Sequence, residues 1–477
     1  MAKFYITTSL PYTNAFPHVG FALEAIQADV LARYHRQKDE DVFFLTGTDE
    51  HGAKISKAAE AAHTTPKEFT DKISGEFRNL TKALNISTDD FIRTTDQERH
   101  WPSVRVVWEK LEENGDLYIK EYEGLYCVGC EAFITKKDLA DDFCKIHKEK
   151  PEVVKEENWF FKLSKYSNDV KNAIESDKLR IVPESRKNEM LEFIKEGLQD
   201  VSFSRPRKDL QWGIPVPGDD SSVIYVWADA LVNYISALGY PNGEKFKKYW
   251  PADVHVVGKD ILRFHATIWP AMLFSLGLEL PKAIFVHGFI TVNGQKMSKT
   301  IGNVVDPFPL IEKYGADAVR YFLLREIPST ADGDFTQKKF EERYNADLAS
   351  GLGNLVARVL TLSTKFEIRN SKQIQNSNLQ KSLKETRKKT EKALDDFQFS
   401  SALEAIWEVV HACDKYIDEK QPWRESPEQK QVIGDLLFMI GEITDLLTPF
   451  LPETSEKIKA QLSGGERTFL FPRILPN

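Results

Sequence analysis

Cysteine is scarce in this sequence, with four in 477 residues. So few thiols exclude a disulfide-stapled scaffold and fit a reducing compartment. No apolar run reaches the ~18 residues that a membrane-spanning helix needs. The N-terminal stretch MAKFYITTSLPYTN lacks the basic head and apolar core of a signal peptide. We therefore expect a cytoplasmic protein whose first residues already belong to the fold.

An excess of positive charge is also missing, because the formal net charge is −8. This balance excludes unspecific electrostatic binding to nucleic acid, so any RNA contact must come from local basic patches. The hydrophobic share of 42% and the charged share of 29% are ordinary for a globular protein. The chain is too long to fold around a single hydrophobic core, so two to four domains are expected.

Strand-like and helix-like stretches alternate in the first part of the chain. KFYITTSL and VFFLTGTDEHG are typical of strands, and ALEAIQADVLARYHRQKD and AKISKAAEAA of helices. The same alternation returns in SSVIYVWADALVNYISAL and DVHVVGKDILRFHATIWPAML. From Pro307 onward strand signals fade and amphipathic helical patterns take over. The sequence therefore predicts an α/β fold with a Rossmann-type parallel sheet, followed by a C-terminal α-helical bundle.

Two short loops carry candidate phosphate-binding groups. In HVGF, His18 can donate a hydrogen bond, and Gly20 lets the backbone approach an anion at the start of a helix. In KMSKT, Lys296 and Lys299 flank a hydroxyl, and Thr300 adds another. Such a loop can bring two ammonium groups onto a polyphosphate. Taken alone, the histidine is better explained as a cap and the lysine pair as an exposed surface loop.

Three of the four cysteines form a metal-ligand pattern. Cys127 and Cys130 make a C-x-x-C pair, and Cys144 and His147 make a C-x-x-H pair, with thirteen residues between the two pairs. Two such pairs fill a tetrahedral Zn²⁺ site completely, which predicts one structural zinc per chain. The alternative, a chance cluster of buried thiols, is hard to reconcile with this spacing. Cys413 lies on an apolar helical face and is expected to be core.

An aromatic stripe precedes the second loop. Trp227, Ala230, Leu231 and Tyr234 share one helical face, and by spacing alone core packing is the better interpretation. A glycine-containing turn then brings Asp260, whose carboxylate suits a ribose hydroxyl.

Together these segments resemble the class I aminoacyl-tRNA synthetases, and within them the bacterial-type methionyl-tRNA synthetases with one zinc site. HVGF and KMSKT stand where that class has its paired HIGH and KMSKS signatures. Further similar segments are SLPYTN, FLTGTDEHG, EGLYCVGC, YVWADALVNYISAL, GKDILRFHATIWPAML, YGADAVRYFLLRE, NADLASGLGNLVARV, QPW and LFPRI. This many motifs in order, over essentially the whole chain, is specific, whereas either signature alone is weak.

The resemblance implies activation of L-methionine by ATP and its transfer to the 3′-terminal ribose of tRNA(Met), for initiation and elongation. Catalysis would then rest on positioning and electrostatic stabilisation, with Mg²⁺ accompanying ATP. The catalytic residues would be His18, Lys296 and Lys299. The ATP-binding set would be His18, Gly20, Gly258, Asp260, Lys296, Lys299 and Thr300.

The same resemblance assigns residues to the two recognition sites. The methionine-binding set would be Leu10, Tyr12, Asp49, Trp227, Ala230, Leu231, Tyr234, Ile261, Phe264 and His265. This changes the interpretation of the aromatic stripe from core to the wall of an apolar slot for the thioether. Asp49 would hold the substrate's ammonium group. The anticodon-binding set would be Asn354, Arg358, Pro422 and Trp423, reading splayed bases by hydrogen bonds and stacking.

The predicted organisation has five parts. They are the first half of the Rossmann domain (1–117), a zinc-bearing connective insertion (118–220), the second half (221–300), a lysine-loop and stem-contact linker (301–345) and the anticodon-binding helical domain (346–477). The chain ends at LFPRILPN without an appended dimerisation domain, so a monomer is expected.

Phe21 stands where the family has a second histidine. For that reason we expect binding of the ATP phosphates by the two loops to depend more on Lys299 than it does in the family.

Two alternatives remain at this stage. The first is another class I synthetase, such as a cysteine enzyme, although that would need an open metal site. Enzymes for branched aliphatic amino acids carry a long editing insertion, for which this chain has no room. The second is a non-catalytic tRNA-binding or zinc-ribbon protein, against which the presence of His18, Lys296 and Lys299 argues.

Overall fold

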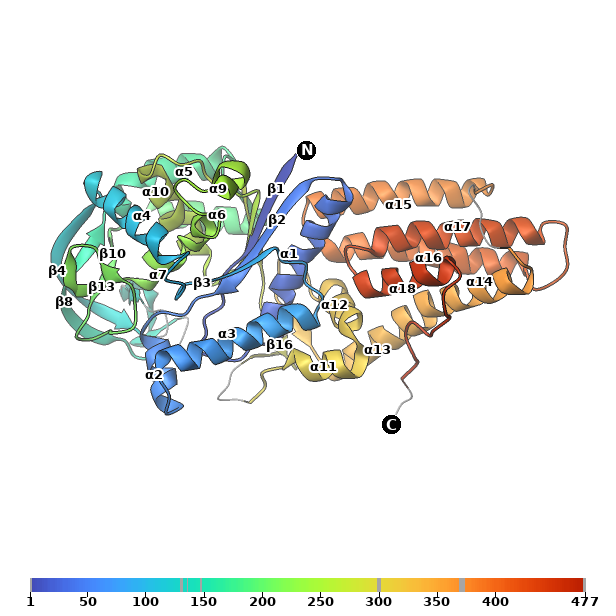
Figure 1. Cartoon of the computed structure of the whole chain (residues 1–477), viewed down its shortest axis with the longest axis horizontal. Coiled ribbons are helices and arrows are strands. Elements are labelled where there is room, and N and C mark those ends of the chain that lie inside the picture. Colours follow the sequence, from blue (N-terminus) through green and yellow to red (C-terminus); the bar gives the residue numbers. More distant parts are fainter. Residues whose placement is uncertain are drawn as a thin grey trace. The chain divides into compact units, whose positions relative to one another are not determined.

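The computed structural model describes residues 2–128, 132–134, 136–145, 148–297, 302–368 and 374–474 (Figure 1). The chain forms two compact units. The first unit comprises Met1–Pro17, Lys38–Asn79 and Thr88–Val286, and the second comprises His18–Gln37, Leu80–Ser87 and His287–Asn477. Both units therefore draw on the N-terminal part of the chain, and neither is one continuous stretch.

A six-stranded sheet organises the first unit, in the order β3-β2-β1-β14-β15-β9. Its strands are β1 (Lys3–Thr8), β2 (Asp41–Thr48), β3 (Asp90–Arg93), β9 (Arg180–Val182), β14 (Val254–Gly258) and β15 (Ala283–His287). The pairings of β1 with β2 and β14, of β2 with β3, and of β15 with β9 are all parallel. Every residue of β14 and β15 is buried, which explains why these strands are mostly apolar and do not alternate with exposed polar residues.

One hydrophobic cluster fills the first unit. It joins residues of the sheet such as Tyr5 and Leu45 to residues of the helices, among them Trp108 and Trp269. The helices of this unit are α2 (Ala53–Ala61), α3 (Pro66–Ala83, which continues into the second unit), α4 (Trp101–Glu113), α5 (Ser167–Glu175), α6 (Glu184–Lys195), α7 (Val226–Ala230), α8 (Asn233–Ser236), α9 (Glu244–Tyr249), the π-helical turn Phe264–Ile268 and α10 (Trp269–Ser275). Strands alternating with helices around a parallel sheet confirm the predicted fold class.

A second, antiparallel sheet is inserted between β3 and β14 in the sequence, in the order β10-β8-β4-β5. Its strands are β4 (Leu117–Cys127), β5 (Ala132–Ile134), β8 (Glu152–Phe161) and β10 (Val201–Ser202). The small ladder of β6 (Leu139–Ala140) with β7 (Phe143–Cys144) follows β5.

The proline-rich strip FSRPRKDLQWGIPVPG, which is typical of a linker, is more ordered than that. It contributes β11 (Ser204–Pro206) and β12 (Pro215–Val216), and both pair with β13 (Asp219–Ile224). Phe203 is fully buried. Strands of two or three residues that contain proline carry no alternating pattern, so they leave no signal in the sequence.

The second unit begins with the long helix α1 (Val19–Gln37). A small sheet orders β17 (Gln295–Lys296), β16 (Ile290–Val292) and β18 (Gly333–Phe335), and the helices α11 (Pro307–Tyr314), α12 (Ala316–Arg325) and α13 (Gln337–Arg343) follow in this region. Asn293 and Gly294 form the turn between β16 and β17, and both have positive φ, 52° and 75°. Asn-Gly is the dipeptide that tolerates this conformation best.

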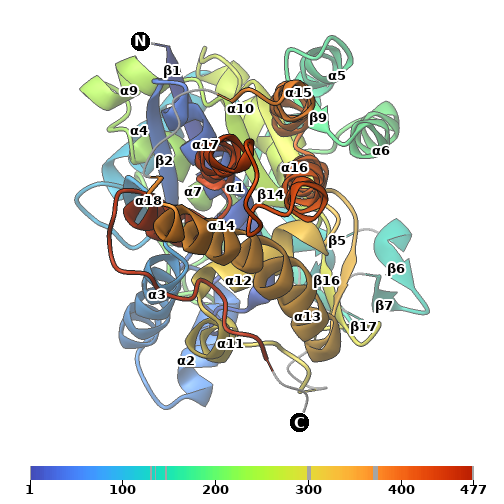
Figure 2. The same ribbon diagram turned by 90° about the vertical axis from the view of Figure 1, so that its right-hand side faces the viewer.

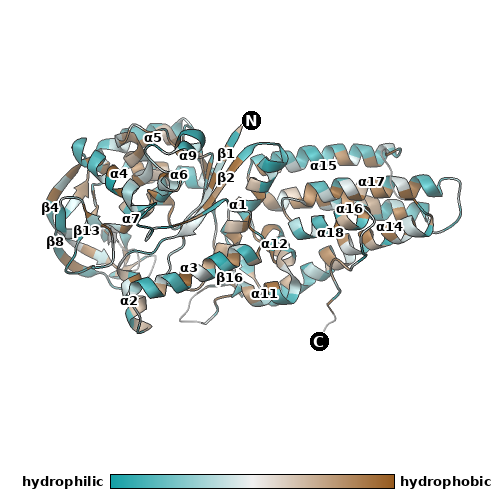
Figure 3. Cartoon of the chain, in the orientation of Figure 1, coloured by the Kyte–Doolittle hydropathy of each residue, from teal (hydrophilic) through white to brown (hydrophobic). Residues whose placement is uncertain are grey.

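The C-terminal part of the second unit is a helical bundle, as predicted. After a π-helical segment (Tyr344–Gly353), its helices are α14 (Asn354–Lys365), α15 (Ser377–Asp395), α16 (Phe399–Lys420), α17 (Gln429–Leu447) and α18 (Pro452–Leu462). Figure 2 views α15, α16 and α17 nearly end-on. Each helix carries both hydrophobic and hydrophilic residues (Figure 3), as packing on one face requires. Among the helices in the described ranges, none is long and apolar enough to cross a bilayer.

Candidate functional site

The His18 turn stands at the start of α1. The Gly20 backbone N–H donates to His18 Nδ1 at 3.0 Å. Because Nδ1 accepts, a neutral ring carries its proton on Nε2. A Cβ on residue 20 would lie 2.7 Å from the imidazole Cε1, so only glycine fits beneath the ring. The local sequence thus fixes the tautomer as well as the orientation of His18.

The segment around the lysine loop returns to the His18 turn within the second unit. Val19 N–H donates to the Val305 carbonyl at 3.2 Å, and the Met297 methyl lies 3.8 Å from where a Gly20 Cβ would be. Lys296 ends β17, and its carbonyl accepts from Asn303 Nδ2 at 3.1 Å. Lys299 and Thr300 lie outside the described residues. The structure therefore brings the two ends of the lysine loop to the histidine turn.

A buried acid–base pair, not noticed in the sequence, lies next to both loops. His287 precedes the lysine segment and Glu24 lies on α1. His287 Nε2 is 2.8 Å from a Glu24 carboxylate oxygen, and His287 Nδ1 is 2.8 Å from the Gly288 carbonyl oxygen. Both side chains are at most 7% exposed. An oxygen faces each ring nitrogen of His287, so each of the two contacts is a hydrogen bond. The bond to Glu24 connects the strand before the lysine loop to the helix after His18.

Most of the predicted methionine set gathers in the first unit. The rings of Trp227 and Phe264 stack with centroids 3.8 Å apart and planes 7° apart. The Tyr234 hydroxyl is 2.7 Å from His265 Nε2, and His265 Nδ1 is 3.0 Å from the Ile261 carbonyl oxygen. A carbonyl can only accept, so Nδ1 carries the proton and Nε2 accepts from the tyrosine.

The remaining members of that set surround this group. Leu10, Tyr12 and Ile261 are partly buried against the same hydrophobic cluster, and Ala230 and Leu231 are buried. These residues come from the ends of β1 and β14 and from α7, so they are distant in the sequence and close in the fold. The result is an aromatic, mostly apolar lining with one hydroxyl–imidazole pair.

Asp49 directly follows β2 and is joined to the segment after β1. It forms a parallel bridge with Tyr12: Asp49 N–H donates to the Pro11 carbonyl, and Thr13 N–H donates to the Asp49 carbonyl, each at 3.0 Å. The Tyr12 hydroxyl donates to the His51 carbonyl at 2.8 Å. Asp49 and Tyr12, predicted to contact the same substrate, are therefore held by one hydrogen-bonded unit.

His51 is anchored by a buried aspartate. Asp229, fully buried, lies 2.6 Å from His51 Nδ1 and 2.7 Å from His100 Nε2. Burial raises the pKa of Asp229, but His51 and His100 lower it more, so the carboxylate stays charged. This carboxylate belongs to the helix α7 that also carries Trp227, so it connects the Asp49 loop to the aromatic wall.

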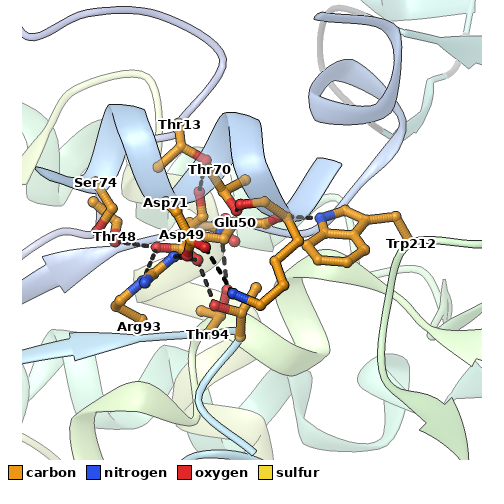
Figure 4. Close-up of polar contacts among 12 residues, drawn as sticks. Thr13, Thr48, Asp49, Glu50, Thr70, Asp71, Ser74, Arg93, Thr94 and Trp212 are labelled. Carbon is orange, nitrogen blue, oxygen red and sulfur yellow. Dashed lines mark hydrogen bonds and ion pairs between the residues drawn. The ribbon is translucent and has the colours of Figure 1, made fainter. Parts of the chain in front are cut away.

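Glu50 is the most densely bonded residue of this loop (Figure 4). Its side chain is completely buried and receives Arg93 Nε at 2.7 Å, Arg93 NH2 at 2.8 Å and the Thr48 hydroxyl at 2.6 Å. Arg93 also pairs with Asp71 at 2.6 Å. The sequence gives no sign of this role for Glu50 or Arg93, because the two residues lie 43 positions apart and no local pattern indicates the pairing.

The two candidate ribose residues follow β14. Gly258 ends that strand and Asp260 stands in the turn after it, at the carboxyl edge of the parallel sheet. This edge is where open α/β sheets bind their ligands. Both residues belong to the first unit, whereas His18 and Lys296 belong to the second.

Two of the four predicted zinc ligands are described. Cys127 ends β4 and Cys144 ends β7; both thiols are 1% exposed and pack in one small cluster with Ile134. Cys130 and His147 lie outside the described residues. Within the described ranges no three His, Cys, Asp or Glu side chains form a metal-holding group. The fold thus brings one cysteine of each predicted pair together.

The candidate anticodon residues lie at one end of the bundle. Trp423 is 44% exposed, so it is not a fully packed core residue. Arg358 on α14 lies 6.0 Å from the Trp423 ring and pairs with Asp418 at 2.8 Å. Asn354, one turn earlier on α14, is exposed, and Pro422 is buried. An aromatic plane beside a guanidinium is a suitable platform for an unstacked base.

Comparison with known proteins agrees with this arrangement. A family model described as tRNA synthetases class I (M) matches residues 4–139 and 134–360, and one described as the anticodon-binding domain of tRNA ligase matches 376–476. The chain therefore belongs to the class I tRNA synthetases.

Curated relatives narrow the class to one amino acid. The chain is 46% identical to the methionine–tRNA ligase of Caldanaerobacter subterraneus over 97% of its own length and 74% of the relative's. For the methionine–tRNA ligase of Thermotoga maritima the values are 42%, 98% and 76%, and for that of Bacillus subtilis 43%, 96% and 73%.

Solved structures agree with these relatives. The Mycobacterium tuberculosis methionyl-tRNA synthetase in complex with methionyl-adenylate matches with a TM-score of 0.94 and 37% identity, covering 99% of this chain and 100% of that one. Its apo form matches with a TM-score of 0.86 and 35% identity, covering 100% and 99%. The chain belongs to the methionine–tRNA ligase family.

Proposed function

We infer that this chain ligates L-methionine to tRNA(Met). The methionine carboxylate attacks the α-phosphate of ATP, which gives methionyl-adenylate and releases pyrophosphate. A hydroxyl of the 3′-terminal ribose of tRNA then attacks the activated carbonyl and releases AMP. The observation that carries this function is a likeness to methionine–tRNA ligases that spans 96% to 98% of the chain. The same products serve initiation and elongation of translation.

The ATP roles follow from the chemistry of the two loops. His18 would donate from Nε2 to a phosphate oxygen, since Gly20 N–H occupies Nδ1. Lys296, Lys299 and the Thr300 hydroxyl would neutralise the charge that develops on the phosphates. Gly258 would allow close approach of the nucleotide and Asp260 would hold its ribose. No covalent intermediate with the protein is needed, so these groups act by positioning and electrostatics.

The methionine roles follow from the lining of the first unit. Trp227, Phe264, Leu10, Tyr12, Ala230, Leu231 and Ile261 would surround the side chain. Tyr234 and His265 would present a polar element to the sulfur, and Asp49 would bind the ammonium group. An apolar slot separates methionine from a side chain one methylene shorter by only about 1–3 kcal/mol, so the polar contacts matter for discrimination.

Two metal ions would have different roles, a structural Zn²⁺ and the Mg²⁺ that accompanies ATP. Cys127, Cys130, Cys144 and His147 would hold one structural Zn²⁺, and the close packing of Cys127 with Cys144 supports this donor set. When bound, such an ion stabilises a small subdomain that has little core of its own. Use of ATP by a class I synthetase is consistent with Mg²⁺, which would accompany the triphosphate.

Asn354, Arg358, Pro422 and Trp423 would read the anticodon. We further propose the five-part organisation 1–117, 118–220, 221–300, 301–345 and 346–477, a monomeric state and a cytoplasmic location, where tRNA is charged.

Pyrophosphate exchange tests the function. Purified chain should catalyse methionine-dependent exchange between pyrophosphate and ATP and should charge tRNA(Met). Exchange with cysteine or leucine but not with methionine would overturn the assignment in favour of another class I enzyme. Lys299→Ala should lower kcat of adenylate formation by about 100-fold or more, whereas Lys338→Ala, on an exposed helical surface, should not.

Metal analysis of the purified chain tests the zinc proposal. It should find one zinc per chain, and an active chain without zinc would refute that proposal.

A further inference from the structure

The residue after Asp49 also carries a carboxylate, and this carboxylate is buried. Glu50 is 0% exposed. Water contributes nothing to its stabilisation, so the protein has to satisfy all of its lone pairs. Arg93 supplies a two-pronged contact, and the hydroxyls of Thr48 and Thr95 donate to the two carboxylate oxygens. This is a complete shell of donors around a single buried group.

The main chain of Glu50 is held as firmly as its side chain. Its N–H donates to the Thr94 hydroxyl at 2.9 Å, and its carbonyl accepts from Trp212 Nε1. Thr94 and Arg93 belong to or directly follow β3, so the contacts to the backbone and to the carboxylate come from the same short segment. The peptide bond between Asp49 and Glu50 is therefore fixed from one side by this segment and from the other by the bridge to Tyr12.

Arg93 is itself fixed by a second acid. Its NH2 group lies 2.6 Å from Asp71 on α3, and Figure 4 shows the guanidinium between the two carboxylates. Burial lowers the pKa of Arg93, but Glu50 and Asp71 raise it more, so the guanidinium stays charged. A planar fork that is charged under all conditions is the group that a fixed carboxylate geometry requires, and lysine cannot replace it in this role.

The position of Asp49 matters because a carboxylate recognises an ammonium group by distance and direction. A binding group must be held to within about 0.5 Å by neighbours that are themselves locked in place. Asp49 sits between the bridge to Tyr12 and the fully bonded Glu50, and its own backbone groups are used by Pro11 and Thr13.

We propose that Glu50 and Arg93 are positioning residues that aim the Asp49 carboxylate at the ammonium group of methionine. The inference rests on the proposed role of Asp49. Neither Glu50 nor Arg93 touches the substrate in this assignment: they act through the loop. Trp212, from a different segment of the chain, adds a hydrogen bond from its indole N–H to the Glu50 carbonyl.

Steady-state exchange kinetics give the first test. In Arg93→Lys and Glu50→Gln, KM for methionine should rise about tenfold or more, the usual effect of one misplaced polar contact. KM for ATP and kcat should stay within about twofold, because the phosphate groups and the reacting carboxylate are untouched. Arg99→Lys is the matched control: Arg99 also pairs with an aspartate, Asp90 at the start of β3, and this pair includes no residue of the Asp49 loop.

Ligand analogues separate aiming from general destabilisation. L-Methioninol keeps the ammonium group, whereas 4-(methylsulfanyl)butanoate lacks it. Arg93→Lys should weaken inhibition by methioninol about as much as it weakens methionine binding, and should leave inhibition by the des-amino acid unchanged. Equal weakening of both inhibitors, or an unchanged KM for methionine in a folded variant, would overturn the inference.

A milder variant guards against loss of the fold. Trp212→Phe removes a single hydrogen bond to the Glu50 carbonyl from a partly buried position. It should reproduce the selective rise in KM for methionine to a smaller extent. An unchanged KM for methionine would contradict the proposal that the contacts of Glu50 position Asp49. If the unmodified chain showed no methionine-dependent exchange at all, the proposed function would fail, which is a different outcome from exchange that is insensitive to these variants.

Discussion

Hydrogen-bond partners assign the tautomers of three histidines in this protein. His18 accepts at Nδ1 from a backbone N–H, so its Nε2 is a donor. His265 donates from Nδ1 to a carbonyl, so its Nε2 is an acceptor. His255 accepts at Nε2 from the Trp269 indole, so its Nδ1 donates to Thr7, and burial holds its pKa well below the usual value. Residues of one type thus differ in role: His18 Nε2 is a donor, His265 Nε2 is an acceptor, and His255 is a neutral core group.

The Tyr234–His265 contact can be tested by removing one atom. Tyr234→Phe deletes the hydroxyl and leaves His265 Nε2 buried without its donor. The cost of an unsatisfied buried acceptor is about 1–3 kcal/mol, so KM for methionine should rise about tenfold. KM for ATP should not change. Tyr240→Phe is the control, since Tyr240 is equally buried and bonds Lys110 away from this lining. An unchanged KM in Tyr234→Phe would show that the pair does not contribute to methionine binding.

Cys413 should be chemically silent in the folded protein. It is fully buried on α16, and burial together with Asp414 raises the pKa of its thiol to about 12. The thiolate is the reactive form, so almost none is present at neutral pH. Iodoacetamide followed by peptide mass spectrometry should leave Cys413 unmodified until denaturant is added. Labelling at the rate of a free thiol in the native protein would contradict the burial.

At the scale of elements, a buried ion pair joins four segments of the second unit. Arg320 on α12 is completely buried, pairs with Asp29 on α1 at 2.8 Å and donates to the carbonyls of Pro449 and Phe450. Asp29 also receives Arg33 and the Ser87 backbone. Helix α1 carries the His18 turn at its other end, so this pair holds the helix that presents a candidate phosphate ligand.

Breaking that pair should destabilise α1 and α12 locally. Arg320→Met leaves Asp29 buried without its main counter-charge, which costs about 3–5 kcal/mol. A chain of this size does not unfold in one step, so hydrogen exchange of peptides from the two helices is the appropriate measurement. Arg325→Met, in the same helix but in a half-exposed pair with Glu404, should cost no more than about 1 kcal/mol. Equal protection in both variants would contradict the prediction.

The same pair predicts an acid response. Burial raises the pKa of Asp29, but Arg320, Arg33 and Ser87 lower it more, so its folded value lies below 3.8. A lowered folded pKa means that the stabilisation is present above the unfolded pKa and is lost as pH falls through the folded one. The difference in protection between the parent chain and Asp29→Asn should therefore be constant from about pH 5 upward and should shrink below about pH 4. A difference that grew on acidification would contradict this sign.

At the scale of the whole molecule, the residues proposed for methionine activation and for anticodon reading belong to different parts of the chain. The proposed methionine residues belong to the first unit, and the proposed anticodon residues belong to the helical bundle of the second. The two half-reactions should therefore respond separately to substitution.

Trp423→Ala tests this separation. Loss of a stacking plane costs about 1–3 kcal/mol per base, so KM for tRNA(Met) in aminoacylation should rise about tenfold. Methionine-dependent pyrophosphate exchange, which needs no tRNA, should remain at the parent level. Phe469→Ala is the control, because Phe469 is the more exposed aromatic at 85% but is not among the candidate anticodon residues. A parallel fall in exchange, or no change in charging, would refute the assignment.

The sequence by itself determined the order of strands and helices, the two loops, the cysteine spacing and the class of enzyme. These features are local: a period of two or of 3.6 residues, a glycine at a turn, or ligands three residues apart are readable along the chain. Even the aromatic stripe was found in this way, although its spacing alone indicates core packing and only the family resemblance gave it a function.

Only the tertiary structure decided which polar groups meet. Glu24 and His287 are 263 positions apart, and Glu50 and Arg93 are 43 apart. Short strands such as β9 and β18 form because a neighbouring strand offers them an edge, and their own three residues carry no period. Pairing across such distances depends on how elements stack, and a buried charge is tolerated only where that stacking delivers its partner. The partners of the Asp49 loop are for this reason a property of the fold and not of any stretch of the sequence.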